Sequence, residues 1–341
     1  MIKAIDFFCG AGGLTRGLLD AGIEVLAGVD NDERLRETYI HNNEPSRFIN
    51  SDIDKIQIHR LREILGIQDE DTTLYAACTP CQPFSTLNRL QGKDERKSLL
   101  LDFAEIVDEC PPDFIIVENV PGLNNAIGKE IYEEFLTVLK KHKFKEAADL
   151  LDAKHFGVPQ TRKRFILVAS RHGSISLPSP ETDTNQFTTV RQCIEKYPAI
   201  AHGESSENHL NHTSRKLKPH LLRIVQAVPK DGGSRRDVED TSILLKCHQE
   251  NPNVHKDVFG RMTWDAPSPT LTCRCIDVYC GRFTHPEQDR GISVREAAAL
   301  QTFGDDYEFF GTSLLGISRQ IGNAVPVKLA EQLGQSIIDS C

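Results

Sequence analysis

The chain has 341 residues, enough for two domains of ordinary size or for one large domain with an insertion. Hydrophobic residues make up 39% and charged residues 26%, which is typical of globular proteins and excludes disordered and collagen-like classes. The formal net charge of −9 does not predict a nucleic-acid-binding protein, so any contact with DNA would have to come from a local basic surface.

The first half of the chain alternates short apolar runs with amphipathic stretches. Strands are predicted at residues 2–8, 24–29, 74–77, 114–117 and 165–169, and helices at residues 15–21, 33–41, 99–109 and 131–139. Alternation of this kind predicts a mostly parallel sheet with helices on both faces. Regular structure returns near the end of the chain, with helices predicted at residues 294–301 and 327–338.

The segment between about 186 and 275 has a different character. It is less regular and richer in polar and turn residues, and it holds 13 Lys and Arg against 10 Asp and Glu, whereas the rest of the chain holds 27 against 39. Its densest basic run begins at Arg215-Lys216-Leu217-Lys218. Such a run is usually a solvated face. A basic insertion in an acidic chain nevertheless favours a surface that faces a polyanion.

Neither a membrane span nor an export signal is predicted. The longest apolar runs are far shorter than the ~20 residues that a membrane helix needs. Asp6 lies too close to the start of the sequence for a secretory signal peptide. The ten cysteines are therefore expected to be reduced and the protein cytoplasmic. The cysteine spacing gives only weak support for structural zinc.

Three strand ends in the first part of the chain suggest a nucleoside-binding edge. The first strand runs into a turn that contains Gly10, Gly12 and Gly13, where the backbone can approach a ligand closely. Thr15 stands where the dinucleotide fingerprint needs glycine, which weakens an NAD-binding interpretation. About 20 residues on, Asp30 can accept from ribose hydroxyls or cap the next helix. Asp52 follows a third predicted strand end.

Reactive side chains follow the later strands. Cys81 comes after Pro80, just beyond a strand, where it can act as a nucleophile; with Cys78 it also forms a C-x-x-C pair typical of redox dithiols. Glu118 follows an apolar strand, where burial would suit it to bond a base ring. Arg162 and Arg164 would share a face if the strand there is regular, and paired arginines suit carbonyl or phosphate oxygens.

Taken in order, these segments resemble the motifs of a known family. The turn Phe8-Cys9-Gly10-Ala11-Gly12 is followed by Pro80-Cys81-Gln82, Glu118-Asn119-Val120 and Gln160-Thr161-Arg162-Lys163-Arg164. Arg295-Glu296-Ala297-Ala298 and Gly322-Asn323-Ala324-Val325-Pro326 come near the end. In this order, and spanning nearly the whole chain, they are similar to the motifs of DNA (cytosine-5)-methyltransferases.

The resemblance implies an α/β fold of the S-adenosylmethionine-dependent methyltransferase type: a Rossmann-like, mixed but mostly parallel sheet with helices on both faces, plus a smaller irregular target-recognition domain. It implies a catalytic and cofactor-binding domain at 1–180, a target-recognition domain at 186–275, and a C-terminal segment at 285–341 that completes the catalytic domain. S-adenosylmethionine would be the cofactor. The residues implied to hold it are Phe8, Gly10, Gly12, Leu14, Asp30, Asn31, Asp52, Ile53, Pro80, Leu99, Asn323 and Val325.

The resemblance also implies a reaction and its residues. Cys81 would attack C6 of a cytosine flipped out of duplex DNA, so that C5 can take the methyl group. Glu118 would hold N3 and the exocyclic amine, and Arg164, supported by Arg162, would contact O2. The implied DNA contacts are Gln82, Ser85 and Arg89 after the cysteine and Thr270 and Arg274 in the insertion. No metal is expected.

Alternatives stay open. A tRNA methyltransferase would keep the fold, although RNA-acting relatives usually lack so large an insertion. An oxidoreductase using Cys78 and Cys81 would bind no S-adenosylmethionine. A non-catalytic DNA-binding relative would have no need of Cys81, Glu118 and Arg164 together. The leading expectation is a bacterial enzyme that acts on double-stranded DNA as a monomer and is associated with the nucleoid. It would belong to a restriction-modification system, with a cognate restriction endonuclease as its functional partner, or to a similar defence system.

Overall fold

The structure is a computed structural model that describes residues 1–79, 99–124, 128–180 and 186–341. Contacts within the chain divide it into two compact units. The first unit comprises Met1–Phe156, Lys163–Glu181 and Val325–Cys341, and the second comprises Gly157–Arg162 and Thr182–Ala324. The second unit thus includes residues 285–324, which are predicted to belong to the C-terminal segment of the catalytic domain. The predicted separate domain at 186–275 stays a prediction.

The first unit is built on a seven-stranded sheet. Its strands are β1 (Ile2–Phe7), β2 (Glu24–Asp30), β3 (Arg47–Asn50), β4 (Thr72–Cys78), β5 (Phe114–Asn119), β6 (Lys145–Asp152) and β7 (Lys163–Ser170). Their order across the sheet is β3-β2-β1-β4-β5-β7-β6. The first five strands in this order are parallel, and β7 is antiparallel to β5 and β6. The predicted mostly parallel sheet is confirmed.

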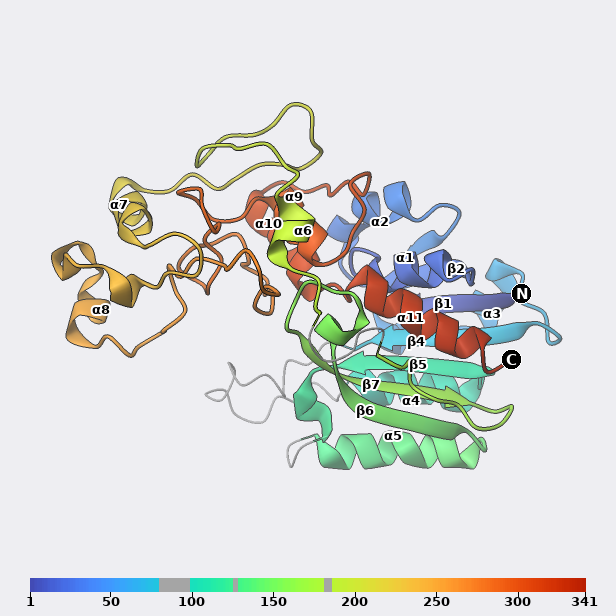
Figure 1. The fold of residues 1–341 in the computed structure, drawn as a ribbon. Helices are drawn as coiled ribbons and strands as arrows, with labels where there is room; N and C mark the ends of the chain where they lie inside the picture. The colour runs from blue at the N-terminus through green and yellow to red at the C-terminus, as the bar shows by residue number, and fades with distance from the viewer. Residues whose placement is uncertain (80–98, 125–127, 181–185) are drawn as a thin grey trace. The chain divides into compact units, whose positions relative to one another are not determined.

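Helices cover both faces of this sheet. The helices of the first unit are α1 (Gly13–Asp20), α2 (Arg36–Asn42), α3 (Ile58–Leu65), α4 (Leu99–Glu109), α5 (Lys129–Lys141) and α11 (Val327–Ile338). α1 and α11 lie on one face, and α4 and α5 lie on the other (Figure 1). The predicted bounds of α4 and α11 are confirmed, whereas α3 and β6 were not predicted. β6 escaped because it is an edge strand with mostly exposed residues and no apolar alternation.

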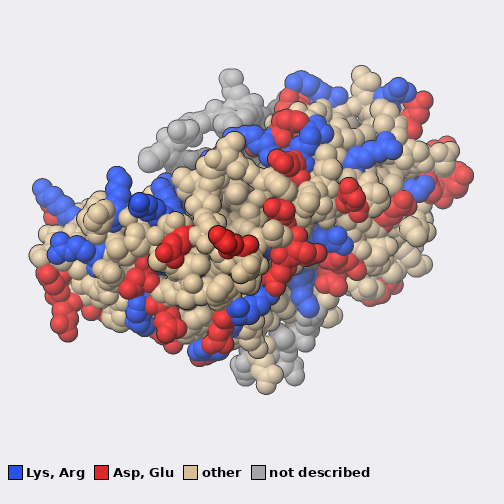
Figure 2. Space-filling model, turned by 90° about the horizontal axis from the view of Figure 1, so that it is seen from above, with Lys and Arg blue, Asp and Glu red and all other residues tan. Residues whose placement is uncertain are grey.

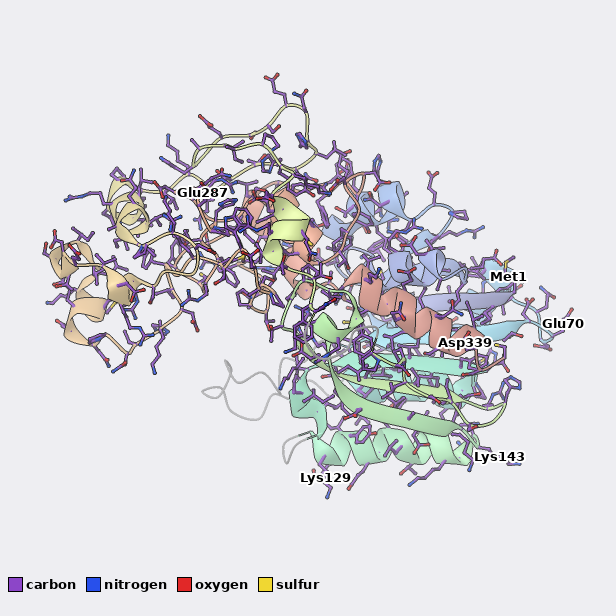
Figure 3. The ribbon with its side chains drawn as sticks, in the orientation of Figure 1. Met1, Glu70, Lys129, Lys143, Glu287 and Asp339 are labelled. Carbon is purple, nitrogen blue, oxygen red and sulfur yellow. The ribbon has the colours of Figure 1, made fainter. Side chains whose placement is uncertain are left out.

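The core of the first unit follows from residue alternation along the strands. Phe7, Tyr75, Ile115 and Leu167 point to the same face and pack with Phe103 of α4 in one buried cluster. On the other face, α1 and α11 pack so closely that a Cβ at Gly17 would overlap Ala330. Met1 and Glu70, which precede β1 and β4, lie at one edge of the sheet (Figure 3). The carboxyl ends of the parallel strands therefore lie at the opposite edge.

Among its described residues, the second unit has helices and isolated β-bridges but no strand. Its helices are α6 (Val190–Ile194), α7 (Pro219–Ala227), α8 (Lys246–Glu250), α9 (Val294–Leu300) and α10 (Leu314–Asn323). Single 3-10 turns occur in both units, at Glu33–Leu35, Ile53–Lys55, Pro121–Asn124, Ala153–Phe156, Arg235–Asp237 and Thr241–Ile243. A small apolar cluster that includes Ile224, Val225 and Phe259 gives the second unit its own core. Among the described residues, no helix combines the length and the apolar character needed to cross a membrane.

Candidate active site

The glycine turn after β1 exposes backbone at the carboxyl edge of the sheet. Gly10 and Gly12 have positive φ angles, of 57° and 89°, which glycine adopts without strain, and Phe8 before them also has a positive φ, of 61°. A Cβ at Gly10 would meet nothing within 4 Å, so the turn faces open space there. The N–H of Gly10 donates to Oδ2 of Asp30 at 3.0 Å, which ties the turn to the end of β2.

Asp30 is a half-buried carboxylate at the end of β2. Its Oδ1 accepts from the backbone N–H of Asp32 at 2.9 Å, and its Oδ2 accepts from Gly10. Burial raises the pKa of Asp30 above its ordinary value, while these backbone hydrogen bonds oppose that rise. Each carboxylate oxygen can accept a further hydrogen bond. Asp30 is thus suited to accept from a pair of hydroxyl groups.

Asn31 and Asp52 meet beside Asp30. The side-chain amide of Asn31 donates to Oδ1 of Asp52 at 2.9 Å, and Lys55 pairs with Oδ2 at 2.5 Å. The hydrogen bond from Lys55 is the main reason that the pKa of Asp52 lies below its ordinary value. The predicted strand end before Asp52 is confirmed, because β3 ends at Asn50. The structure therefore brings together the polar residues that the sequence predicted at three strand ends.

The predicted apolar cofactor residues differ in exposure and in the unit to which they belong. Leu14 and Ile53 are buried, whereas Phe8 and Leu99 are half-buried against the core of the first unit. Val325 is a buried residue of the first unit. Asn323 belongs to the second unit, where its side-chain oxygen accepts from the thiol of Cys273 at 2.9 Å.

Asp6 is a buried polar residue of this region that sequence reasoning missed. Its Oδ2 accepts from the hydroxyl of Thr15 at 2.7 Å, and that hydroxyl lies 3.0 Å from the hydroxyl of Tyr39. Burial raises the pKa of Asp6 to about 7. An acid between the apolar residues Ile5 and Phe7 of the strand was the available signal, since a buried acid needs a polar partner. The glycine turn thus rests on a buried network of hydrogen bonds.

The reactive edge lies where β4 and β5 end. The two strands are parallel, with Cys78 opposite Glu118 in the register. The thiol of Cys78 donates to Oε2 of Glu118 at 2.8 Å, and Nε of Arg164 pairs with Oε1 at 2.8 Å. The Glu118 side chain is only 4% exposed. Glu118 is therefore held from both sides, by residues of β4 and β7.

Thr79, which follows β4, also meets Asn119, the last residue of β5. The side-chain amide of Asn119 donates to the hydroxyl of Thr79 at 2.6 Å, and its carbonyl oxygen accepts from the N–H of Val120 at 2.8 Å. These bonds fix the backbone just before the predicted nucleophile. The predicted residues Pro80, Cys81, Gln82, Ser85 and Arg89 lie outside the described residues.

Arg162 and Arg164 have different surroundings. β7 begins at Lys163, so Arg162 precedes the strand, and the shared face expected for a regular strand does not apply to it. Arg162 is buried in the second unit, where it donates to the carbonyls of Leu271 at 3.0 Å, Gly322 at 3.2 Å and Ala324 at 3.1 Å. Only Arg164 reaches Glu118.

A comparison with models of protein families identifies the family of this chain. The model of C-5 cytosine-specific DNA methylases matches residues 2–339. The chain belongs to this family of enzymes. It is thus a DNA (cytosine-5)-methyltransferase, and S-adenosylmethionine is its methyl donor. The suspected resemblance is confirmed by a match that spans nearly the whole chain.

The methylase is similar to curated and solved relatives along its full length. It is 36% identical to the type II methylase M.HgiDII of Herpetosiphon aurantiacus, over 98% of this chain and 94% of that protein. It is 29% identical to the type II methyltransferase M1.HphI of Haemophilus parahaemolyticus, over 98% and 86%. A candidate DNA modification methyltransferase encoded within an Escherichia coli prophage matches with a TM-score of 0.73 and 22% identity, over 99% of both chains. This last likeness confirms the methyltransferase fold.

The polar groups near the glycine turn fit the donor of the methylase. Ribose hydroxyls need carboxylate acceptors, and Asp30 has acceptor capacity beside the open space at Gly10. A sulfonium and an amino acid need close backbone approach, which the turn at Gly10 and Gly12 allows. The residues present therefore suit S-adenosylmethionine.

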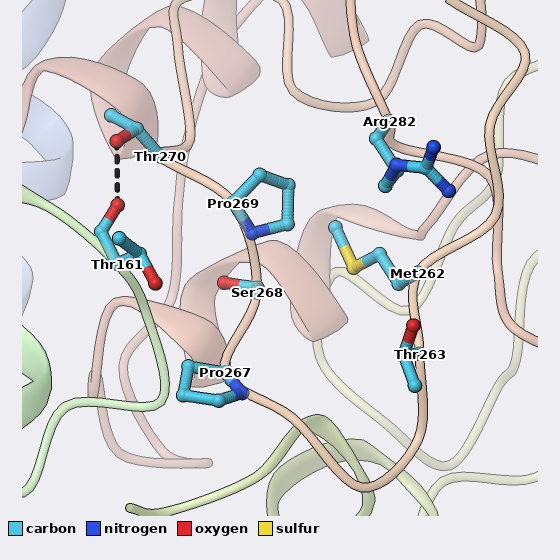
Figure 4. Close-up of a pocket in the computed structure, with 8 residues that line it drawn as sticks. All are labelled: Thr161, Met262, Thr263, Pro267, Ser268, Pro269, Thr270 and Arg282. Atoms are coloured by element: carbon cyan, nitrogen blue, oxygen red, sulfur yellow. Dashed lines mark hydrogen bonds between the residues drawn. The ribbon is translucent and has the colours of Figure 1, made fainter. Parts of the chain in front are cut away.

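The remaining predicted DNA contacts of the methylase lie in the second unit. The hydroxyl of Thr270 donates to the carbonyl of Thr161 at 2.6 Å. A shallow pocket of about 400 Å³ lies beside it (Figure 4), lined by Thr161, Met262, Thr263, Pro267, Ser268, Pro269, Thr270 and Arg282. Nε of Arg274 donates to Oδ2 of Asp277 at 2.7 Å. Among the described residues, no group of three or more His, Cys, Asp and Glu side chains could hold a metal ion.

The basic insertion is less basic on its surface than its composition suggests. Two of its arginines, Arg235 and Arg261, are buried and donate to backbone carbonyls. On the face shown in Figure 2, basic and acidic side chains are intermixed. The composition of the insertion therefore overestimates how cationic its surface is. A DNA-binding surface there depends on particular exposed residues.

Proposed function

We propose that this methylase acts on a cytosine flipped out of duplex DNA and joins Cys81 covalently to C6 during the reaction. The observation that supports this most is the buried Glu118 carboxylate, which Arg164 and Cys78 hold at the carboxyl ends of β4 and β5. The chain passes from the end of β4 to Cys81 in three residues. A carboxylate and a guanidinium side by side suit the polar edge of a cytosine.

The chemistry assigns each group a part. The thiolate of Cys81 forms a bond to C6, and the electron pair of the C5–C6 double bond shifts to C5 and into the adjoining C4–N3 bond, so C5 becomes nucleophilic. Glu118, protonated or sharing a proton, donates to N3 and accepts from the exocyclic amine, and it offsets the charge that the addition creates. Arg164 bonds O2, and the Thr79 carbonyl accepts from the amine. After methylation, removal of the C5 proton and elimination of the Cys81 thiolate restore the aromatic ring and release 5-methylcytosine.

S-adenosylmethionine supplies the electrophilic methyl group. Asp30 would accept from its ribose hydroxyls, Asn31, Asp52 and Ile53 would contact its adenine, and Phe8, Gly10, Gly12 and Leu14 would line its methionine end. Pro80, Leu99, Asn323 and Val325 are proposed to complete the site. Arg162 is better suited to a positioning role, because its donors engage three backbone carbonyls of the second unit.

The target ring cannot be reached within a stacked duplex, so the base has to leave the helix. We propose that Gln82, Ser85 and Arg89 contact the DNA around the flipped base. Thr270 and Arg274 would contact it from the target-recognition domain at residues 186–275, while residues 1–180 and 285–341 would carry the catalytic chemistry. Cations and hydroxyls at these positions suit phosphate and base edges.

The deciding experiment supplies tritium-labelled S-adenosylmethionine and mixed-sequence duplex DNA to the native protein, with Cys81→Ala as the matched control. We expect 5-methylcytosine, identified by mass spectrometry, from the native protein alone. A trapped protein–DNA adduct with 5-fluorocytosine duplexes would test the covalent bond separately, since the C5 fluorine cannot leave as a proton does. Transfer to tRNA but not to DNA would contradict the proposal.

We further propose that the enzyme is the modification methylase of a type II restriction system or of a similar defence system, acting as a monomer in the bacterial cytoplasm at the nucleoid. The similarity to type II methylases over nearly the whole chain supports this. Plasmid DNA from cells that express the enzyme should resist one restriction endonuclease whose site it methylates. If the plasmid DNA were still cut by every endonuclease whose recognition site contains a cytosine that the enzyme methylates, a protective role would be contradicted.

A further inference from the structure

An arginine cluster in the second unit suggests how the DNA sequence is read, an inference that rests on the proposed action on duplex DNA. Asp277 is fully buried and pairs with Arg215, which comes from a distant part of the insertion, and with Arg274. The hydroxyl of Tyr279 accepts from Nη1 of Arg215 at 2.7 Å and from Nη2 of Arg274 at 2.9 Å. We propose that Arg215 reads a guanine of the recognition sequence.

The two arginines use different edges of their guanidinium groups. Arg274 directs Nε and Nη2 to Asp277, at 2.7 Å and 2.6 Å, so its side-on edge is occupied. Arg215 is anchored to Asp277 and Tyr279 through Nη1 alone. No acceptor among the described residues engages its Nε or Nη2, and its side chain keeps 31% of its surface exposed. Arg215 thus retains the two parallel donors of a bidentate contact.

The surroundings of Arg215 hold it in place and leave its charge only partly neutralised. Its guanidinium lies 5.6 Å from the ring centroid of Tyr279, and that of Arg274 lies 5.2 Å away. Two arginines share one carboxylate, so the cluster is cationic. The adjacent Lys216 is exposed and forms no ion pair with the described residues. An anchored cation loses less conformational freedom on binding than a free side chain does.

A guanine edge is the ligand that this geometry fits best. In the major groove, guanine presents O6 and N7 as two acceptors side by side, and a paired guanidinium edge is their most frequent partner in proteins. A phosphate would also accept from Arg215, but a phosphate contact carries no sequence information, whereas both acceptors of a guanine are met only when the guanidinium edge is held in line with them. The anchoring by Asp277 and Tyr279 is therefore the feature that favours base reading.

The test measures which cytosines are methylated in a randomised duplex library, by sequencing 5-methylcytosine. The native enzyme should require guanine at one position of the recognition sequence. In Arg215→Ala, the preference for guanine over the other bases at that position should fall about 10-fold to 100-fold. Arg215→Lys keeps the charge but lacks the paired edge, so it should lose the same selectivity. Arg274 still pairs with Asp277 in both variants, so the buried carboxylate stays compensated.

Two further variants separate base reading from general DNA affinity. Lys216→Ala removes the neighbouring cation and should leave the sequence preference intact. Tyr279→Phe removes one anchor of Arg215 and should relax the same guanine position, though less than Arg215→Ala. The assignment would be overturned if Arg215→Ala kept the sequence preference of the native enzyme. It would also be overturned if Arg215→Ala methylated all sites equally less and its DNA binding depended less steeply on salt concentration, as expected for a lost phosphate contact. If the native protein methylated no duplex, the proposed function itself would fail.

Discussion

The two units bury their backbones by different means. In the first unit, strands pair along their length, and every residue of β5 is buried. In the second unit, long stretches have neither helix nor strand, and buried arginines donate hydrogen bonds to the backbone carbonyls instead. All five buried arginines among the described residues belong to it: Arg162, Arg235, Arg261, Arg290 and Arg295.

Arg261 shows what the buried arginines do. It donates to the carbonyls of Val225 at 2.9 Å, Val228 at 3.1 Å, His285 at 3.0 Å and Gln288 at 2.8 Å. Buried carbonyls need donors, and irregular chain offers few of its own. A guanidinium carries five donors, so one side chain can replace several ladder bonds. The difference between the units teaches that irregular chain can be buried where a few buried cations donate to its carbonyls.

The largest expected effect comes from removing one of these cations. Arg261→Met should lower the free energy of unfolding by about 3–5 kcal/mol, because three buried carbonyls and one half-buried carbonyl lose their donor. Urea denaturation, with hydrogen exchange to locate the loss, measures this. Lys216→Met, at an exposed site, should change stability by less than about 0.5 kcal/mol. Equal effects of the two substitutions would mean that buried arginines do not organise the second unit.

The two units should also respond to pH in opposite directions. Burial raises the pKa of Asp6 from 3.8 to about 7, so the first unit loses stability as pH rises across that interval. Burial lowers the pKa of His285 from 6.5 to about 4, so the second unit loses stability as pH falls across that interval. The pKa of Glu296, held at about 2 by Arg290 against the effect of burial, adds a further loss below 4.5.

Hydrogen exchange at about pH 5 and about pH 8 would resolve these trends unit by unit. Going from the higher to the lower pH, protection in the first unit should rise by about 3 kcal/mol, and protection in the second unit should fall by about 2 kcal/mol. Asp6→Asn should abolish the rise in the first unit, since asparagine still accepts from Thr15 but does not titrate. Parallel changes in both units would contradict this assignment of the buried groups.

A smaller effect tests the close packing in the first unit. Gly17→Ala would push a methyl group into Ala330 and the carbonyl of Val327, where α1 meets α11. The expected cost is about 1–3 kcal/mol, seen as a lower melting temperature. Gly316→Ala is the matched control, since the added methyl would contact only the Ser313 hydroxyl, at 3.3 Å. If both variants melted like the native protein, α11 would not depend on this close approach.

The contrast between the units also explains what the sequence could predict. Short apolar runs identified the strands that carry Asp30 and Glu118, because strands of a parallel sheet that is covered on both faces are apolar on both faces. The same reasoning failed for Arg162 and Arg261, whose burial depends on carbonyls that are distant in sequence. In irregular chain, composition shows that cations are present but not whether they face solvent. Cys78 was noted only for its spacing to Cys81, and its bond to Glu118 needed the register of β4 and β5.

The smallest expected effect concerns that bond, which separates a positioning role of Cys78 from a redox role. If its thiol only holds Oε2 of Glu118, Cys78→Ala should lower kcat about 5-fold, the equivalent of one hydrogen bond, with little change in KM for DNA or in melting temperature. Cys78→Ser, which keeps a donor, should restore most of kcat. A C-x-x-C redox mechanism makes the opposite prediction, because serine cannot form a disulfide and Cys78→Ser would then be as inactive as Cys81→Ala. The serine variant therefore decides between the two roles, since in it hydrogen bonding survives and thiol chemistry does not.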